Sequence, residues 1–143
     1  MEMTRNAINT IGALAAGLTT FLFGARDGWL WALLAFVALD YITGVIAAWM
    51  TKTLSSEVGA KGLAKKVLLL AIVSMANILD TATGAGGVLR NLVIGFYLAN
   101  EGLSLIENAS RCGVPVPPKL VDTLAQLKDG GAKQPAKPSE KDE

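Results

Sequence analysis

The sequence contains no histidine and only one cysteine, Cys112, among its 143 residues. Without histidine the chain lacks the commonest general base, proton shuttle and metal ligand of proteins. A lone cysteine forms neither an intrachain disulfide nor a paired thiolate site. The net charge of +1 provides no basic surface for a nucleic acid. We therefore expect a protein that is not an enzyme, with no cofactor, no bound metal and no nucleic-acid partner.

Charge of either sign is also scarce. Charged residues make up 17% of the chain, hydrophobic residues make up 52%, and the mean hydropathy is +0.44. A soluble domain has about 25% charged residues, so this balance indicates a membrane protein. Much of the charge lies after residue 108, which leaves the first part of the chain strongly apolar.

Apolar stretches occupy residues 7–24, 29–50, 63–83 and 88–106. Each approaches or exceeds the length of about 20 residues that a helix needs to cross the hydrocarbon of a bilayer. The connectors are short, and short connectors indicate antiparallel neighbours. We predict an all-α integral membrane bundle of three to four transmembrane helices in two hairpins, forming one transmembrane domain over residues 1–108. The first stretch is also compatible with a cleaved signal peptide or with a helix lying on the membrane surface.

The chain changes character after the fourth stretch. Prolines 115, 117 and 118 stop the helix, and Lys119–Lys128 then places apolar residues on one helical face. For residues 109–128 we predict a linker and a short amphipathic helix that lies on the inner membrane surface or packs on a neighbouring subunit. The composition of residues 129–143 predicts a disordered, charged tail.

The orientation follows from the basic residues at the ends of the spans. Four lysines belong to the connector after the second span or to its flank: Lys52, Lys61, Lys65 and Lys66. The positive-inside rule predicts that this basic loop is cytoplasmic and lies on anionic lipid, and that both termini are cytoplasmic. Trp29 and Trp49 mark the two ends of the second span about 30 Å apart, as in an aromatic belt.

Several polar residues lie within the apolar stretches or at their ends: Asp40, Asp80, Arg90, Asn100, Glu101 and Glu107. A carboxylate at the centre of a span costs about 2.5–3.5 kcal/mol, so these groups need partners. Asp80 and Arg90 lie symmetrically about the Gly84–Gly87 turn, which predicts a salt bridge across it. A catalytic pair of Asp40 and Asp80 is disfavoured because the two residues lie at different depths.

Asp40 and Glu101 lie at nearly the same depth, and no cation is obviously placed for them. Each is then protonated, hydrogen-bonded or in contact with water. Two interpretations stay open: a static polar contact between helices, or a set of groups that line an aqueous path when subunits assemble.

Small residues recur at helical spacing in three of the spans. They are Ala13, Gly17 and Gly24 in the first, Gly44 and Ala48 in the second, and Gly95 and Ala99 in the fourth. Such residues let helix backbones approach closely in lipid. We predict that they are packing positions, either within one subunit or between subunits.

Two blocks of sequence carry a resemblance. The first is Leu39-Asp40-Tyr41-Ile42-Thr43-Gly44 with Gly59-Ala60-Lys61-Gly62, and the second is Tyr97-Leu98-Ala99-Asn100-Glu101-Gly102 with Gly113-Val114-Pro115-Val116-Pro117. Over residues 39–124 the chain resembles the phage lysis and toxin-secretion holin family, whose members are often drawn with three spans.

The resemblance implies a protein of the bacterial host cytoplasmic (inner) membrane that accumulates there as a homo-oligomer of high order. The oligomers would form lesions that dissipate the membrane potential and release an endolysin, or a toxin, for host cell lysis. Two alternatives remain: a small ion or proton channel or transporter subunit that uses the buried carboxylates as a relay, and an antiholin that restrains a separate lytic protein.

Overall fold

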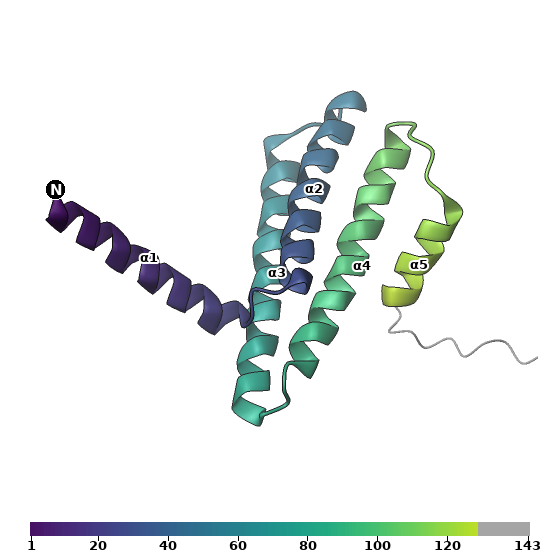
Figure 1. Ribbon diagram of the computed structural model, residues 1–143. Helices are drawn as coiled ribbons and strands as arrows, with labels where there is room; N and C mark the ends of the chain where they lie inside the picture. Colours follow the sequence, from purple (N-terminus) through teal and green to yellow (C-terminus); the bar gives the residue numbers. More distant parts are fainter. Residues whose placement is uncertain (129–143) are drawn as a thin grey trace, which may run out of the picture.

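The computed structural model describes residues 1–128, which form helices and connectors without a strand. The helices are α1 (Glu2–Phe23), α2 (Gly28–Met50), α3 (Ser56–Thr83), α4 (Val88–Arg111) and α5 (Pro118–Lys128) (Figure 1). The all-α prediction and the short C-terminal helix are confirmed. The predicted disordered tail, residues 129–143, lies outside the described residues.

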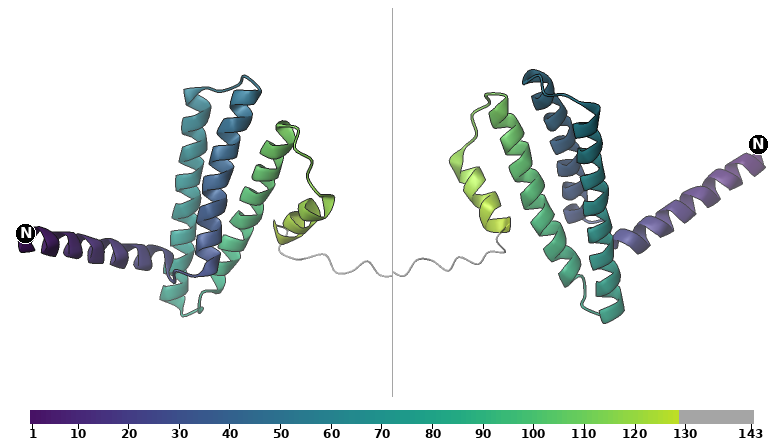
Figure 2. Two further views of the ribbon diagram at one scale, coloured as in Figure 1. Left: turned by 45° about the horizontal axis from the view of Figure 1, so that its top comes forward. Right: turned by 180° about the vertical axis from the view of Figure 1, so that it is seen from behind.

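Helices α2, α3 and α4 form a three-helix bundle in which successive helices are antiparallel, so that α2 and α4 run parallel, and α5 folds back along α4 (Figures 1 and 2). The largest fully buried side chains are Leu33, Val73 and Ile94, one from each helix of the bundle. We call the end that carries the α2–α3 connector the inner end, after the predicted orientation, and the end with the α3–α4 turn the outer end.

The helix boundaries follow from local capping. The Asp27 carboxylate accepts a hydrogen bond from the Leu30 amide at the start of α2, and the Ser55 hydroxyl accepts one from the Val58 amide at the start of α3. Gly84 ends α3 in the left-handed conformation. Because the cap lies at Ser55, α3 begins about two turns before the predicted residue 63.

Helix α1 does not form the predicted hairpin with α2. It projects from the bundle near the outer end, none of its residues is buried in the described structure, and it contacts α3 only near its last turn (Figures 1 and 2). The connector explains this direction, because Gly24 adopts a φ of 73° and the Asn77 side chain donates a hydrogen bond to the Phe21 carbonyl at 2.9 Å. We call residues 21–27 the elbow.

Three helices, α1, α2 and α3, are long and apolar enough to cross a membrane. Helix α4 is as long as α2 but is more polar, and it lies enclosed by α2, α3 and α5. The outward faces of α2 and α3 expose large apolar side chains, among them Leu39, Ile42, Val67, Leu68 and Met75. A surface of this kind is covered by lipid or by another protein.

The elbow depends on the absence of a side chain at Gly24. A Cβ there would overlap the Asn77 side-chain amide, and the positive φ would strain any other residue. We expect Gly24→Ala to lower the free energy of unfolding by about 1–3 kcal/mol, measured by thermal unfolding in detergent micelles. Gly12→Ala is the matched control, because Gly12 lies within α1 with open space around it. A loss of stability as large in the control would contradict the role of the elbow.

Candidate functional site

Three helices contribute side chains to a polar cluster within the bundle. The Lys66 ammonium donates to Asp40 Oδ2 at 2.5 Å and to a carboxylate oxygen of Glu101. The Asn108 amide donates to Asp40 Oδ1 at 3.0 Å. The three charged side chains are only 10–13% exposed. We call Asp40, Lys66, Glu101 and Asn108 the inner cluster.

Helical spacing explains how these residues meet. Glu101 and Asn108 are two turns apart on α4, and Lys66 lies on the same face of α3 as the core residues Leu69 and Val73. The long aliphatic part of lysine carries the charge across the helix interface to both acids. The cluster therefore replaces apolar packing by charge-assisted hydrogen bonds at one level of the bundle.

The structure corrects the prediction for Lys66. It does not lie on the membrane surface with the basic loop, and the statement that no cation is placed for Asp40 and Glu101 was wrong. The physical reason is the packing of α3, which places Lys66 on the same face as the buried residues Leu69 and Val73 and so turns it towards α2 and α4. By contrast Lys52 lies in the α2–α3 connector, and Lys61 and Lys65 are exposed on α3.

A partly polar cavity of about 370 Å³ is lined by the inner cluster and extends from it to the α2–α3 connector. Its lining comes from α2, the connector, α3 and α4, and includes Gly44, Ala48, Ser104, Glu107 and Arg111. Across the described part of the chain, no group of three or more Cys, Asp or Glu side chains could hold a metal ion.

A second cluster lies at the outer end. The Arg90 guanidinium pairs with Asp27 Oδ2 at 2.8 Å and donates to the carbonyl oxygens of Phe23 at 2.6 Å and Ala25 at 2.7 Å. Arg90 is 4% exposed, so these contacts replace its hydration almost completely. We call Asp27, Asp80 and Arg90 the outer cluster; it ties the elbow to α4.

The predicted salt bridge between the Asp80 and Arg90 side chains was wrong. The Asp80 carboxylate instead accepts hydrogen bonds from the backbone amides of Leu89 at 3.1 Å and Arg90 at 2.7 Å. The first amides of a helix have no partner within it, and a carboxylate there satisfies them. The sequence reasoning missed Asp27 as the partner of Arg90, although its position just before an apolar run is a signal for a helix cap.

The outer cluster also perturbs a titration. The Arg90 guanidinium, hydrogen-bonded to the Asp27 carboxylate, holds the pKa of that carboxyl below its usual value of 3.8. Asp27 is therefore ionised in the folded protein to a lower pH than in the unfolded chain.

The remaining predicted positions differ in their surroundings. Ala99 is buried, and Gly95 lies on α4 with its Cβ position 3.7 Å from the Trp29 ring of α2. Ala13 and Gly17 lie on the exposed helix α1, where Gly17 has no neighbour within 4 Å of a Cβ position. Asn100 is partly exposed. The small residues of α4 thus lie at contacts within the subunit, whereas those in the body of α1 have no such contact.

An apolar exterior around buried, paired charges defines an integral membrane protein of the helical-bundle class. The model of the bacteriophage holin family matches residues 17–129, and the chain belongs to that family. This confirms the resemblance read from the two sequence blocks.

Individual relatives agree with the family. An uncharacterized 14.9 kDa protein of Clostridium perfringens, from the nagH 3' region, is 44% identical over 126 residues, which are 85% of this chain and 96% of the relative. The YqxH protein of Bacillus subtilis is 38% identical over 109 residues, 76% of this chain and 77% of the relative. A protein of Bacillus phage phi105 named a probable holin is 40% identical over 104 residues, 73% of this chain and 76% of the relative. No solved structure matches the chain.

Removal of the shared ammonium should destabilise the bundle. We expect Lys66→Met to lower the free energy of unfolding by about 3–5 kcal/mol, because it leaves two buried carboxylates without their cation. Lys65→Met is the matched control, since Lys65 is the exposed neighbour of Lys66 on the same helix. Thermal unfolding in detergent micelles measures both variants. Equal stability of the two would contradict the structural role of the inner cluster.

Acid should weaken the outer cluster. Because the pKa of Asp27 is lowered in the folded state, its stabilisation is complete above the unfolded value of 3.8 and is lost as pH falls through the lowered pKa. We expect Asp27→Asn and Arg90→Gln each to reduce the dependence of unfolding temperature on pH below about pH 4. Unfolding scans over a series of acidic buffers test this. An Asp27→Asn variant with the wild-type pH dependence would refute it.

Proposed function

We propose that the protein is a holin that accumulates and oligomerises in the bacterial cytoplasmic membrane and forms lesions there. The lesions dissipate the membrane potential and let an endolysin reach the cell wall. Membership of the bacteriophage holin family over residues 17–129 is the observation that carries this proposal. A relative in Bacillus phage phi105 named a probable holin supports it.

The inner cluster supplies a physical means. In the single subunit, Lys66 donates to both Asp40 and Glu101, which lowers the cost of burying these carboxylates in a bundle surrounded by lipid. When many copies gather, water that enters the adjoining cavity would reach the same charges without separation of the helices. The adjoining cavity already brings polar side chains to one edge of the cluster. The free-energy cost of exposing the Asp40 and Glu101 carboxylates to water is small, whereas the cost of exposing them to hydrocarbon is large.

The distribution of charge supports an orientation. Lys52, Lys61 and Lys65 lie at the inner end of the bundle, as does Arg111 at the end of α4. We place this end in the cytoplasm by the positive-inside rule. If α1 crosses the membrane, as its length and composition allow, both termini are also cytoplasmic.

A small ion or proton channel is the second candidate function. The polar cavity that reaches two buried carboxylates favours it, because such groups form proton relays in membrane proteins. The two functions differ in what crosses the membrane: a lesion of the proposed kind passes a folded endolysin, whereas a channel passes ions alone.

Induced expression in bacteria, with and without a co-expressed endolysin, tests the proposal. We expect the membrane potential to collapse in both cultures and the culture density to fall sharply only with the endolysin. Collapse of the membrane potential without endolysin release would support the channel. The absence of both collapse and lysis would support an antiholin.

The role of the buried acids is tested by Asp40→Leu and Glu101→Leu. Each variant should shift the onset of lysis in the endolysin culture, because each changes the charge balance around Lys66. Glu57→Leu is the control, since Glu57 pairs with Lys61 on the exposed surface of α3. If both variants insert, oligomerise and lyse cells on the wild-type schedule, the acids have no part in assembly.

A further inference from the structure

Helix α5 lies deep along the bundle rather than at its end. The methyl groups of Leu124 lie 3.0 and 3.1 Å from the position of a Cβ on Gly102, and the Phe36 ring lies 3.3 Å from it. Gly102 follows Glu101 on α4, so the middle of α5 is level with the inner cluster. The missing side chain at Gly102 is what lets α5 come this close to α4.

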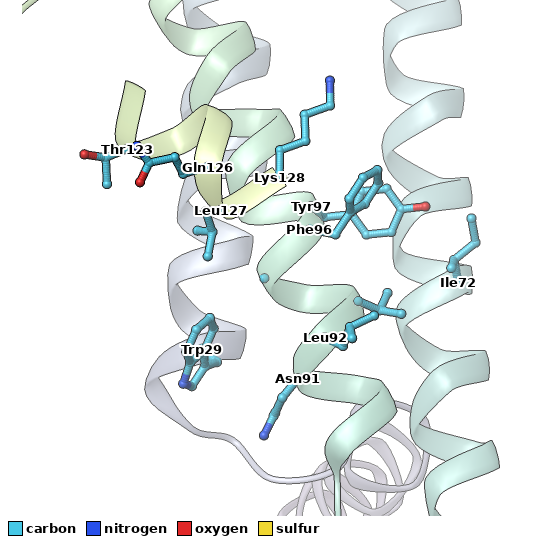
Figure 3. Close-up of a pocket in the computed structure, with 12 residues that line it drawn as sticks. Trp29, Ile72, Asn91, Leu92, Phe96, Tyr97, Thr123, Gln126, Leu127 and Lys128 are labelled. Carbon is cyan, nitrogen blue, oxygen red and sulfur yellow. The ribbon is translucent and has the colours of Figure 1, made fainter. Parts of the chain in front are cut away.

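From that point α5 continues towards the outer end. Leu127 and Lys128 line an apolar groove of about 790 Å³ together with Trp29 at the start of α2 and Phe96 of α4 (Figure 3). The ribbon views in Figures 1 and 2 show the end of α5 beside the middle part of α4. The last turn of α5 therefore lies well inside the length of α2 between Trp29 and Trp49, which corresponds to the hydrocarbon layer.

The middle of the outward face of α5 is polar. Asp122, Thr123 and Gln126 are exposed there and share one side of the helix with Lys119, while the exposed Leu120 and Leu127 lie along one edge of that side. The face that packs on the bundle consists of Val121, Leu124 and Ala125, each partly buried. A charged residue in the hydrocarbon centre costs about 2.5–3.5 kcal/mol, so lipid cannot cover α5 in this position without a large penalty.

The opposite side of the bundle has the reverse character. Along α3, Leu68 and Met75 are 63% and 54% exposed, and the other exposed positions from Val67 to Leu79 are apolar as well. This face suits lipid chains. The two sides of one subunit thus differ in the environment that each tolerates at the same depth.

We propose that, in the assembled lesion, the side of the bundle covered by α5 faces water and the outward face of α3 faces lipid. The proposal rests on the holin function and specifies which surface lines the hole. Asp122, Thr123 and Gln126 then line the aqueous space, and α4 is shielded from it by α5 over its inner half.

Two cysteine positions at similar depth test the proposal. Met75 and Phe96 each lie eight residues from the outer end of their helices, and Gln126 lines the same groove as Phe96. Gln126→Cys and Met75→Cys, each in a Cys112→Ala background, are spin-labelled and reconstituted as full-length protein in liposomes at high protein density. Deuterium modulation of the spin echo in heavy water reports contact of each label with water.

We expect several-fold stronger water contact at Gln126 than at Met75. A second label at Lys61, on the exposed surface of α3, gives the distance that shows whether α5 remains docked on α4. A dry label at Gln126, or a wet label with α5 displaced from α4 to the membrane surface, would overturn the proposal. Wet labels at both positions would overturn it too.

Release of an encapsulated protein from the same liposomes tests the holin function separately. Release with a dry Gln126 would keep the function and reject the assigned surface. No release would count against the function, while the water contact at Gln126 would still decide whether the α5 side is aqueous.

Discussion

The position of α4 in the bundle depends on one ammonium group. Glu101 on α4 and Asp40 on α2 lie at the same level of the bundle. Two carboxylates that approach each other in a medium of low dielectric constant repel each other strongly. Lys66 donates to both and removes most of this penalty. With the charges paired, the most polar long helix packs between two apolar ones and contributes Ile94 and Leu98 to the core. The apolar packing above and below the inner cluster follows from this pairing.

The outer cluster has a different physical task. Arg90 binds the carbonyl groups at the end of α1 and the Asp27 carboxylate at the start of α2, so one side chain of α4 sets the path of the elbow. Helix α1 then leaves the bundle with none of its residues buried and contacts α3 near its last turn. A helix of this length and apolarity, held at its last turn alone, is suited to contact lipid or neighbouring copies.

Taken together, the chain has two polar clusters within an apolar core, polar side chains along α5, and exposed apolar side chains along α2 and α3. In most membrane bundles the charges inside serve one fixed conformation or one pathway. Here the paired charges adjoin a polar cavity at the inner end, and the polar helix α5 lies at the same level on the outside. This arrangement covers polar groups within an apolar exterior while leaving polar side chains on α5, which is the combination that the proposed function requires.

The sequence by itself determined the helical class, the apolar character of a membrane protein, the second and fourth helices to within a few residues, and the family, because hydrophobic length and local motifs depend on neighbouring residues alone. It also identified Asp40 and Glu101 as groups at one depth. It did not identify Lys66 as their partner, because that assignment needs the rotation and register with which α3 packs on α2 and α4. It paired Arg90 with Asp80, which lies nearby along the chain. The fold instead brings Arg90 into contact with Asp27, which lies 63 positions away in the sequence. The depth of α5 likewise depends on the contact of Leu124 with Gly102. Only tertiary structure decides such contacts, because they join residues that no local pattern connects.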